Sequence, residues 1–277
     1  MRGQIRRIDS RLHLQDGPID LIVEAFGADR DAAYSAAAER FVTILDELCC
    51  ELLLLRSGGA APQGIVARRM WDAVHPYACQ TFITPMAAVA GSVAEEVLGA
   101  MTAAVPLRRA YVNNGGDIAV HLAPGETLRI GMVDRPDQPS LFGSLFLSAE
   151  QPVRGIATSG WRGRSFSLGI ADAVTVLADT AAMADAAATI IANAVDLPGH
   201  PAIARRPAME LAPDNDLGAR LVTVAVGTLS EREKELALAR GCRAAEACLE
   251  RQLIGAAALH LGGLTRQVEG VPQIRAA

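Results

Sequence analysis

The chain has 277 residues, of which 51% are hydrophobic and 4% aromatic. A chain of this length can bury a sizeable core, and abundant alanine beside few aromatic residues predicts close aliphatic packing of helices and strands. The 26 basic and 31 acidic residues are interleaved along the sequence and give a net charge of −5, which disfavours nucleic acid as a partner.

The cysteines and the N-terminus bear on the compartment. Five cysteines show neither CxxC spacing nor the density of a secreted disulfide scaffold, so free or buried thiols are expected. The N-terminal segment lacks an apolar run of signal-peptide length. We therefore expect a cytoplasmic protein without a membrane partner. The five scattered histidines predict no zinc site.

The first hundred residues predict a hairpin followed by two helices. Asp16-Gly17 separates two partly alternating runs in residues 10–24, as in a β-hairpin. Apolar residues recur every three or four positions over residues 33–55 and predict a helix that ends at RSGGAAPQG. Residues 81–101 have a proline near their start and small residues throughout, which predicts a second helix open to close approach.

Short strands and two strand–helix units complete the chain. The runs RAYVNNGGDIAVHL, TLRIGMV, LFGSLFLS and PVRGIATSG indicate a largely antiparallel sheet. ADAVTVLA and RLVTVAVGTL each precede a helical pattern, the second with Ser230 and Glu233 at capping-box spacing. Residues 197–216 are predicted to be a loop. The whole predicts an α+β fold with Ala-rich helices on a mostly antiparallel sheet, as one domain over 1–270 with a tail over 271–277.

The first candidate site is the glycine turn Asn113-Asn114-Gly115-Gly116-Asp117 at the start of a strand. Paired glycines allow backbone amides to approach an anionic or planar ligand, and the carboxylate can accept hydrogen bonds from ribose or ring NH groups. The alternative is an ordinary hairpin turn.

The second candidate is the strand end at Thr158-Ser159-Gly160. Two hydroxyls and a glycine can hold phosphate oxygens, whereas the alternative is a turn whose hydroxyls satisfy its own backbone. No Ser/His/Asp ordering accompanies the segment, so Ser159 is not expected to be a nucleophile.

The third candidate is the Ala-rich helix that carries Asp185 and Thr189. The two lie four residues apart and share a helix face with only alanines between them. Carboxylate and hydroxyl oxygens suit Mg²⁺, which commonly binds substrate phosphates as well. The alternative is a solvent-facing polar pair.

Taken in order, NNGGDIAVHL, RIGMVDRP, GIATSGW and ADAVTVLADTAAMADAAATIIANA resemble the motifs of ApbE-type proteins, the flavin transferases that take FMN from FAD. The resemblance covers roughly residues 81–195 and is closest to a shorter, uncharacterised cytoplasmic branch. It implies an ApbE-like fold that binds FAD, FMN or a related nucleotide with Mg²⁺.

The resemblance also implies roles for single residues. Asp185 and Thr189 match the family's magnesium ligands, and Ala87 in PMAAVAGSVAEE matches a backbone carbonyl ligand. Flavin-contacting positions fall at the first glycine turn and at the second loop. In order, they are Asn114, Gly115, Gly116, Asp117, Thr158, Ser159 and Gly160.

Two departures from the family pattern leave enzymatic activity open. Ala90-Gly91 stands where the family usually carries Lys-Gly, and GWRGRSFSLGIADAV lacks the catalytic His found there in the transferases. The favoured hypothesis is a nucleotide- or flavin-binding protein that acts on a small molecule. The alternatives are an FMN transferase with another base, for which Asp172 is the candidate, and a non-catalytic assembly or delivery protein. A homodimer is the default expectation.

Overall fold

The computed structural model describes residues 3–133, 141–270 and 274–276. These residues cluster into two compact units. Unit 1 comprises 1–128, 147–157 and 178–186, and unit 2 comprises 129–146, 158–177 and 187–277. Strand β8 (Gly155–Ser159) and helix α5 (Ala181–Ala194) each begin in unit 1 and end in unit 2. The single-domain boundary of 1–270 stays a prediction.

Unit 1 contains an antiparallel sheet with one packed face. Residues of β3 alternate between buried and half-buried, because successive strand side chains point to opposite faces. The strand order is β1-β2-β3-β4-β5-β8. The other strands are β1 (Gln4–Ile8), β2 (Arg11–Asp16), β3 (Ile19–Phe26), β4 (Arg109–Asn114) and β5 (Asp117–Leu122). The hairpin predicted at Asp16-Gly17 is confirmed as β2–β3.

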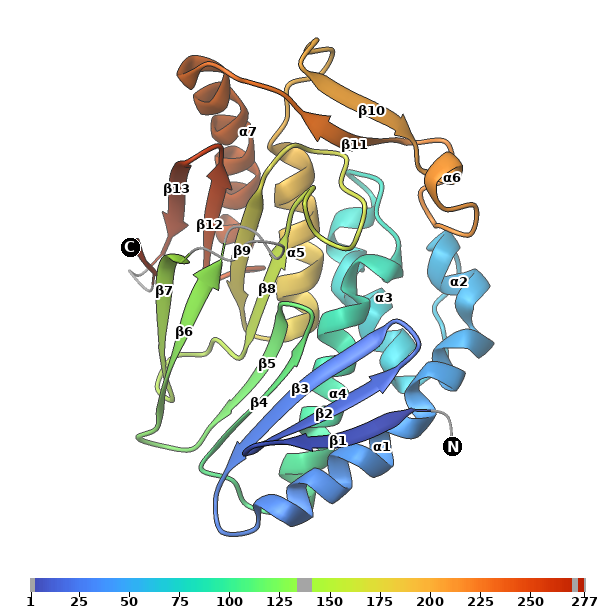
Figure 1. Cartoon of the computed structure of the whole chain (residues 1–277), viewed down its shortest axis with the longest axis vertical. Coiled ribbons are helices and arrows are strands. Elements are labelled where there is room, and N and C mark those ends of the chain that lie inside the picture. Colours follow the sequence, from blue (N-terminus) through green and yellow to red (C-terminus); the bar gives the residue numbers. More distant parts are fainter. Residues whose placement is uncertain (1–2, 134–140, 271–273, 277) are drawn as a thin grey trace. The chain divides into compact units, whose positions relative to one another are not determined.

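Helices α1 (Arg30–Cys50) and α4 (Val89–Ala104) cover the buried face of this sheet (Figure 1). The predicted helix over 33–55 is interrupted at Glu51, and α2 (Leu52–Ser57) follows. The Glu51 carboxylate accepts the amides of Gln63 and Gly64 at 2.6 and 2.7 Å. It thereby tethers the segment that enters α3 (Ile65–Ala78), a helix that the sequence patterns did not predict.

The helix predicted over 81–101 begins later and ends later than expected. A 3₁₀ turn, η1 (Pro85–Ala88), leads into α4, with proline at the helix start where its missing N–H costs nothing. Among the described residues, the stretch Pro85–Ala104 is the one helix long and apolar enough to cross a membrane, with a mean hydropathy of 1.2 and 44% of its window buried. Core helices of folded domains meet the same criterion.

Among the described residues, three groups of strands lie wholly or largely in unit 2. β12 (Ala256–Leu261) pairs with β9 (Ala173–Ala178) and with β13 (Leu264–Glu269), and α7 (Glu231–Glu250) packs on β12 and β13. β10 (Ile203–Pro207) pairs with β11 (Leu221–Val226), and α6 (Ala208–Leu211) follows β10. The third group is β6 (Thr127–Val133), β7 (Leu141–Ser148) and β14 (Ile274–Ala276).

The predicted class, α+β with a mostly antiparallel sheet and Ala-rich helices, is confirmed by the mixture of helices and mostly antiparallel strands. The loop predicted over 197–216 is wrong in part, because it contains β10 and α6. Those strand residues pair with β11, a partner that local composition does not reveal. Of the predicted tail over 271–277, residues 271–273 and 277 lie outside the described residues, and Ile274–Ala276 form β14.

Candidate functional site

The NNGGD segment forms the tight turn between β4 and β5. Asn114 pairs with Asp117 in the ladder, and Gly115 and Gly116 have φ angles of 68° and 117°. Such angles strain residues with a β-carbon, which explains the paired glycines. The Asn113 side-chain oxygen accepts the Gly116 amide at 2.9 Å. The geometry fits both of the interpretations offered from the sequence, a hairpin turn and a ligand-facing bend.

This turn is attached to the first turn of α4. Asn114 is 4% exposed, and its Nδ2 donates to the Ala90 carbonyl at 3.2 Å. The next amide, that of Gly91, donates to Oδ2 of Asp185 at 3.0 Å. The beginning of α4 thus joins the glycine turn to Asp185, although the three segments are far apart in the sequence.

Asp185 is held in an unfavourable setting for a carboxylate. Burial raises its pKa well above the ordinary value, and the nearby carboxylate of Asp117 raises it further, while hydrogen bonds from the amides of Gly91 and Ala90 lower it. Burial and like charge both penalise the ionised form. A cation at this point would relieve both penalties.

Of the other two predicted metal ligands, Thr189 lies on the same helix as Asp185, and Ala87 lies in the 3₁₀ turn before α4. Thr189 is half-buried in α5, one turn beyond Asp185, so the two share a helix face as expected. Ala87 lies in η1, where its amide donates to the Thr84 carbonyl at 3.0 Å. Asp185 and Ala87 belong to unit 1, and Thr189 belongs to unit 2.

The second predicted loop belongs to unit 2 from Thr158 onward. Oγ1 of Thr158 is 2.9 Å from Oγ1 of Thr175, while Ser159 is half-buried. A β-carbon on Gly160 would lie 2.4 Å from the Asp172 carbonyl oxygen, so this glycine is required by close backbone packing. The ligand contacts predicted for Thr158, Ser159 and Gly160 stay predictions.

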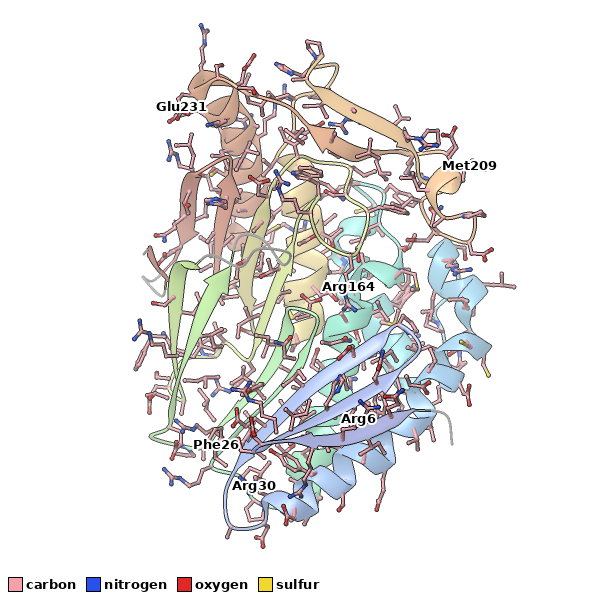
Figure 2. The ribbon with its side chains drawn as sticks, in the orientation of Figure 1. Arg6, Phe26, Arg30, Arg164, Met209 and Glu231 are labelled. Carbon is pink, nitrogen blue, oxygen red and sulfur yellow. The ribbon has the colours of Figure 1, made fainter. Side chains whose placement is uncertain are left out.

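Asp172, the candidate base, is engaged by three donors within unit 2. Its Oδ1 accepts the Arg162 guanidinium at 2.7 Å and the Trp161 indole at 3.2 Å, and its Oδ2 accepts the Gly262 amide at 2.7 Å. These contacts tie the loop after β8 to the β12–β13 turn. Arg164, labelled in Figure 2, is exposed in the same loop.

The structure adds Glu95, which the sequence patterns did not single out. Its Oε2 accepts the amide of Ala182, in the first turn of α5, at 2.7 Å. Burial raises the pKa of the Glu95 carboxyl, with the Ala182 amide and Arg69 acting in the opposite direction. The only signal in the sequence is its position one turn after Gly91 in PMAAVAGSVAEE.

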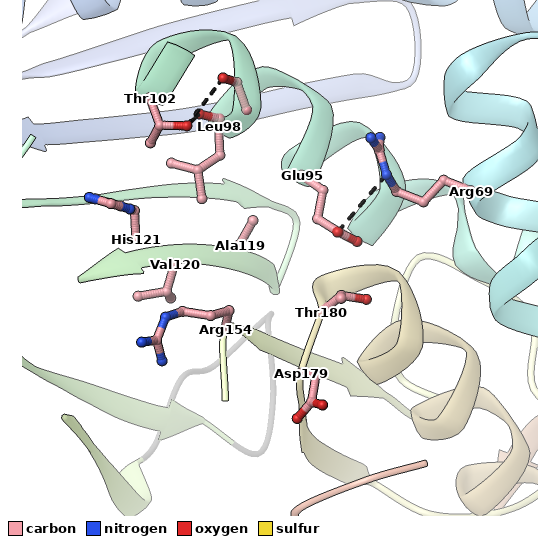
Figure 3. A pocket seen from close by; sticks show the side chains of 11 residues that line it. Arg69, Glu95, Leu98, Thr102, Ala119, Val120, His121, Arg154, Asp179 and Thr180 are labelled. Carbon is pink, nitrogen blue, oxygen red and sulfur yellow. Dashed lines mark hydrogen bonds and ion pairs between the residues drawn. The ribbon is translucent and has the colours of Figure 1, made fainter. Parts of the chain in front are cut away.

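A cavity of about 270 Å³ opens beside Glu95 in unit 1 (Figure 3). Its walls come from α3, α4, β5 and the segments around Arg154 and Asp179. Arg154 donates to the carbonyls of Ala149, Gln151 and Val153. The cavity mixes acidic and basic groups, namely Arg69, Glu95, His121, Arg154 and Asp179, so it does not select one sign of ligand charge.

The described residues contain no group of three or more His, Cys, Asp or Glu side chains placed to hold a metal ion. A cation at Asp185 would therefore depend on mixed oxygen donors, including hydroxyl, carbonyl and ligand oxygens. Mg²⁺ accepts such a set because it commonly retains waters and binds substrate phosphates.

Comparison with known families identifies the group to which these motifs belong. The profile of a family described as AbpE bacteria matches residues 2–268. The chain belongs to this family. The resemblance to ApbE-type proteins is thereby confirmed, and it extends well beyond the motifs over 81–195.

Among curated proteins, the chain is similar to UPF0280 proteins of archaea. It is 38% identical over 139 residues to the protein of Methanopyrus kandleri, covering 50% of this chain and 52% of that one. It is 41% identical over 114 residues to the protein of Methanosphaerula palustris, covering 41% and 47%. The chain matches about half the length of these relatives.

Two solved structures are also similar. The ApbE protein of Thermotoga maritima gives a TM-score of 0.49 at 12% identity, covering 96% of this chain and 97% of that one. The apo form of the Pseudomonas stutzeri flavinyl transferase ApbE gives 0.42 at 9% identity, covering 97% and 95%. The family assignment depends on the profile match alone.

Proposed function

We propose that the protein binds FAD, FMN or a related nucleotide together with Mg²⁺, and that Asp185 holds the cation. One observation carries the proposal: Asp185 lies at the start of α4 with its carboxylate near that of Asp117. Two carboxylates in a partly buried place favour a bound cation, and a helix start favours an anion such as phosphate.

The oxygen donors fit Mg²⁺ in kind. Asp185 supplies a carboxylate, Thr189 is proposed to supply a hydroxyl and Ala87 a backbone carbonyl. Ser92, next to Gly91, is fully buried, and its Oγ has no hydrogen-bond partner among the described residues. Its unsatisfied hydroxyl supports the idea that this helix start is built to meet a further polar group. Bound Mg²⁺ would neutralise the negative charge of a pyrophosphate.

The remaining ligand contacts are proposed from the family motifs. The turn at Asn114, Gly115, Gly116 and Asp117 would contact the flavin or its ribose, and the loop at Thr158, Ser159 and Gly160 would contact the nucleotide. Within unit 1, the link from Asn114 to Ala90 supports a shared role for the turn and the helix start.

Flavin transfer is the second candidate function, because the family resembles flavin transferases. Asp172 is its candidate base, but the contacts with Arg162, Trp161 and Gly262 favour a role in holding the loop. We therefore favour cofactor binding, with action on a small molecule, over transfer to a protein threonine. A cytoplasmic homodimer and a non-catalytic delivery role stay hypotheses.

Binding is tested by titrating the purified chain with FAD, FMN and ADP, with and without Mg²⁺, by isothermal calorimetry. We expect Mg²⁺-dependent affinity that Asp185→Asn lowers about tenfold or more, since Asn can still accept the Gly91 amide but lacks the charge. Asp179→Asn, the same change at an exposed carboxylate, should bind as wild type. Equal affinity in all three proteins would contradict the proposed cation site.

One incubation distinguishes cofactor binding without transfer from flavin transfer. FAD, Mg²⁺ and a threonine-bearing peptide are mixed with the protein, and covalent flavin and released AMP are measured by mass spectrometry. Binding without either product supports the favoured function. Formation of both products supports transfer, in which case the effect of Asp172→Asn on the rate decides whether that carboxylate serves as the base.

A further inference from the structure

Helices α4 and α5 cap each other within unit 1. The start of α4 receives no cap from its own flanking side chains, and Asp185 of α5 instead accepts the Gly91 amide at 3.0 Å. In return, Glu95 of α4 accepts the Ala182 amide at 2.7 Å. Each helix thus places a carboxylate on an amide in the first turn of the other, where such amides lack partners further back in their own helix.

The two helix starts are in backbone contact. A β-carbon on Gly91 would lie 2.2 Å from the Ala181 carbonyl oxygen, so only glycine permits this approach. The contact places Gly91 beside the first residue of α5, from which Asp185 is one turn away. Because the approach is close, a small displacement of α5 would move the Asp185 carboxylate away from the start of α4.

Glu95 is itself fixed by its surroundings. Nε of Arg69 lies 3.9 Å from its Oε1, and the Thr180 side chain is a further hydrogen-bond partner (Figure 3). The Thr180 hydroxyl also accepts the Met183 amide at 3.2 Å. The first turn of α5 is therefore held by hydrogen bonds at adjacent residues, and the hydrogen bond that comes from α4 is accepted by Glu95.

We propose that Glu95 is a positioning residue for the cation site: by holding the first turn of α5 against α4, it fixes the Asp185 carboxylate in the place where Mg²⁺ binds. This inference rests on the proposed function, since it takes Asp185 as the Mg²⁺ ligand. Glu95 acts through the backbone of α5 and not by contact with the metal.

The test compares Glu95→Ala and Glu95→Gln by titrating the full chain with Mg²⁺ in calorimetry and with Mn²⁺ in electron paramagnetic resonance, without nucleotide. Loss of a group that orients a metal ligand lowers metal affinity about 10- to 100-fold, which is the loss expected for Glu95→Ala. Glu95→Gln keeps an oxygen for the Ala182 amide and should retain affinity within about threefold, which corresponds to about 0.7 kcal/mol.

The matched control is the adjacent carboxylate, Glu96, which accepts Arg40 at 2.7 Å and Arg69 at 2.9 Å. Glu96→Ala should lower the melting temperature while leaving Mg²⁺ affinity near wild type. If Glu95→Ala does not fold, Glu95→Asp replaces it, because its shorter side chain cannot reach the Ala182 amide and should also weaken Mg²⁺ binding.

The outcomes separate the two proposals. Wild-type protein that binds no Mg²⁺ or Mn²⁺ overturns the proposed cation site and this inference with it. Binding by wild type that is lost in Asp185→Asn but unchanged in Glu95→Ala or Glu95→Asp overturns the positioning role alone. Equal losses in the Glu95 and Glu96 variants also overturn it, because they indicate general destabilisation.

Discussion

At the scale of single residues, two glycines of α4 have opposite environments. Gly91 faces the Ala181 backbone so closely that an added β-carbon would overlap the carbonyl group, whereas Gly99 has no atom within 4 Å of the same position. Glycine in a helix costs conformational entropy. Its presence at position 91 is therefore explained by contact with α5, and at position 99 nothing in the packing requires it.

Alanine substitution at these two positions should shift stability in opposite directions. Gly91→Ala should lower the free energy of unfolding by about 2 kcal/mol or more through overpacking. Gly99→Ala should raise it by about 0.5–1 kcal/mol, because it removes chain entropy from the unfolded state without a clash. Chemical denaturation measures both. A Gly91→Ala variant with an unchanged free energy of unfolding would show that α4 and α5 move apart at little energetic cost.

At the scale of elements, the start of α7 shows how a local sequence signal becomes a complete cap. The Ser230 side chain accepts the Glu233 amide, and Glu233 in turn accepts the Ser230 amide at 2.7 Å. His200 lies 2.8 Å from the Glu233 carboxylate. The cap was predicted from spacing, but the histidine contact arises only in the folded unit 2.

Removing the cap hydroxyl should destabilise the protein modestly. Ser230→Ala should lower the free energy of unfolding by about 1 kcal/mol, since the Glu233 amide loses its acceptor. Denaturation midpoints of the variant and wild type measure the change. An unchanged midpoint would indicate that solvent satisfies this amide equally well.

The carboxylate of the cap gives a pH dependence with a definite sign. The hydrogen bond with His200, together with those from the Ser230 amide and hydroxyl, lowers the pKa of Glu233 to about 2. Because folding lowers this pKa, the stabilisation that ionised Glu233 provides is complete well above its unfolded-state pKa of about 4.3. This stabilisation is lost as the pH falls toward 2.

Glu233→Gln should therefore be less stable than wild type at pH 7, and the difference should shrink steadily as the pH falls from about 5 to 3. Urea unfolding at a series of pH values measures it. A difference that stays constant over this range would mean that the charge of Glu233 contributes nothing.

At the scale of the whole molecule, the five cysteine thiols, which are distributed over both units, differ in their exposure to solvent. None of the five cysteines forms a disulfide; Cys49, Cys50 and Cys79 are exposed, whereas Cys248 is buried. Burial raises the pKa of the Cys242 thiol, and the nearby Glu246 raises it further. Because the thiolate is the reactive form, exposure and a low pKa both favour alkylation.

Native protein treated with iodoacetamide should therefore be labelled first at Cys49, Cys50 and Cys79, more slowly at Cys242, and at Cys248 only after unfolding. Peptide mass spectrometry measures the order. Protection of the three exposed thiols in native protein, lost on dilution, would indicate that a second copy covers this surface. Rapid labelling of Cys248 would contradict its burial.

Several parts of the fold were predictable because their causes are local. Turn chemistry at Asp16-Gly17 predicts the β2–β3 hairpin, and two successive glycines predict the bend between β4 and β5. Other parts were not. β10 looks like loop because its pairing partner, β11, is distant in the sequence, and the helix over 33–55 gave no sign of the break at Glu51, whose carboxylate binds amides more than ten residues away.

Some features of the candidate site were likewise predictable from the sequence, and others depend on the tertiary structure. Asp117, Asp185 and Thr189 were predicted by residue type and by resemblance, since hard oxygen donors suit a divalent cation and the family resemblance implies a nucleotide. The sequence alone thus determined the family and the class of fold, and it predicted the kind of ligand. Tertiary structure decided that Asp185 meets Gly91, 94 positions away, and that Glu95 meets Ala182, 87 positions away. Such pairs depend on how two packed helices approach, which no local spacing specifies.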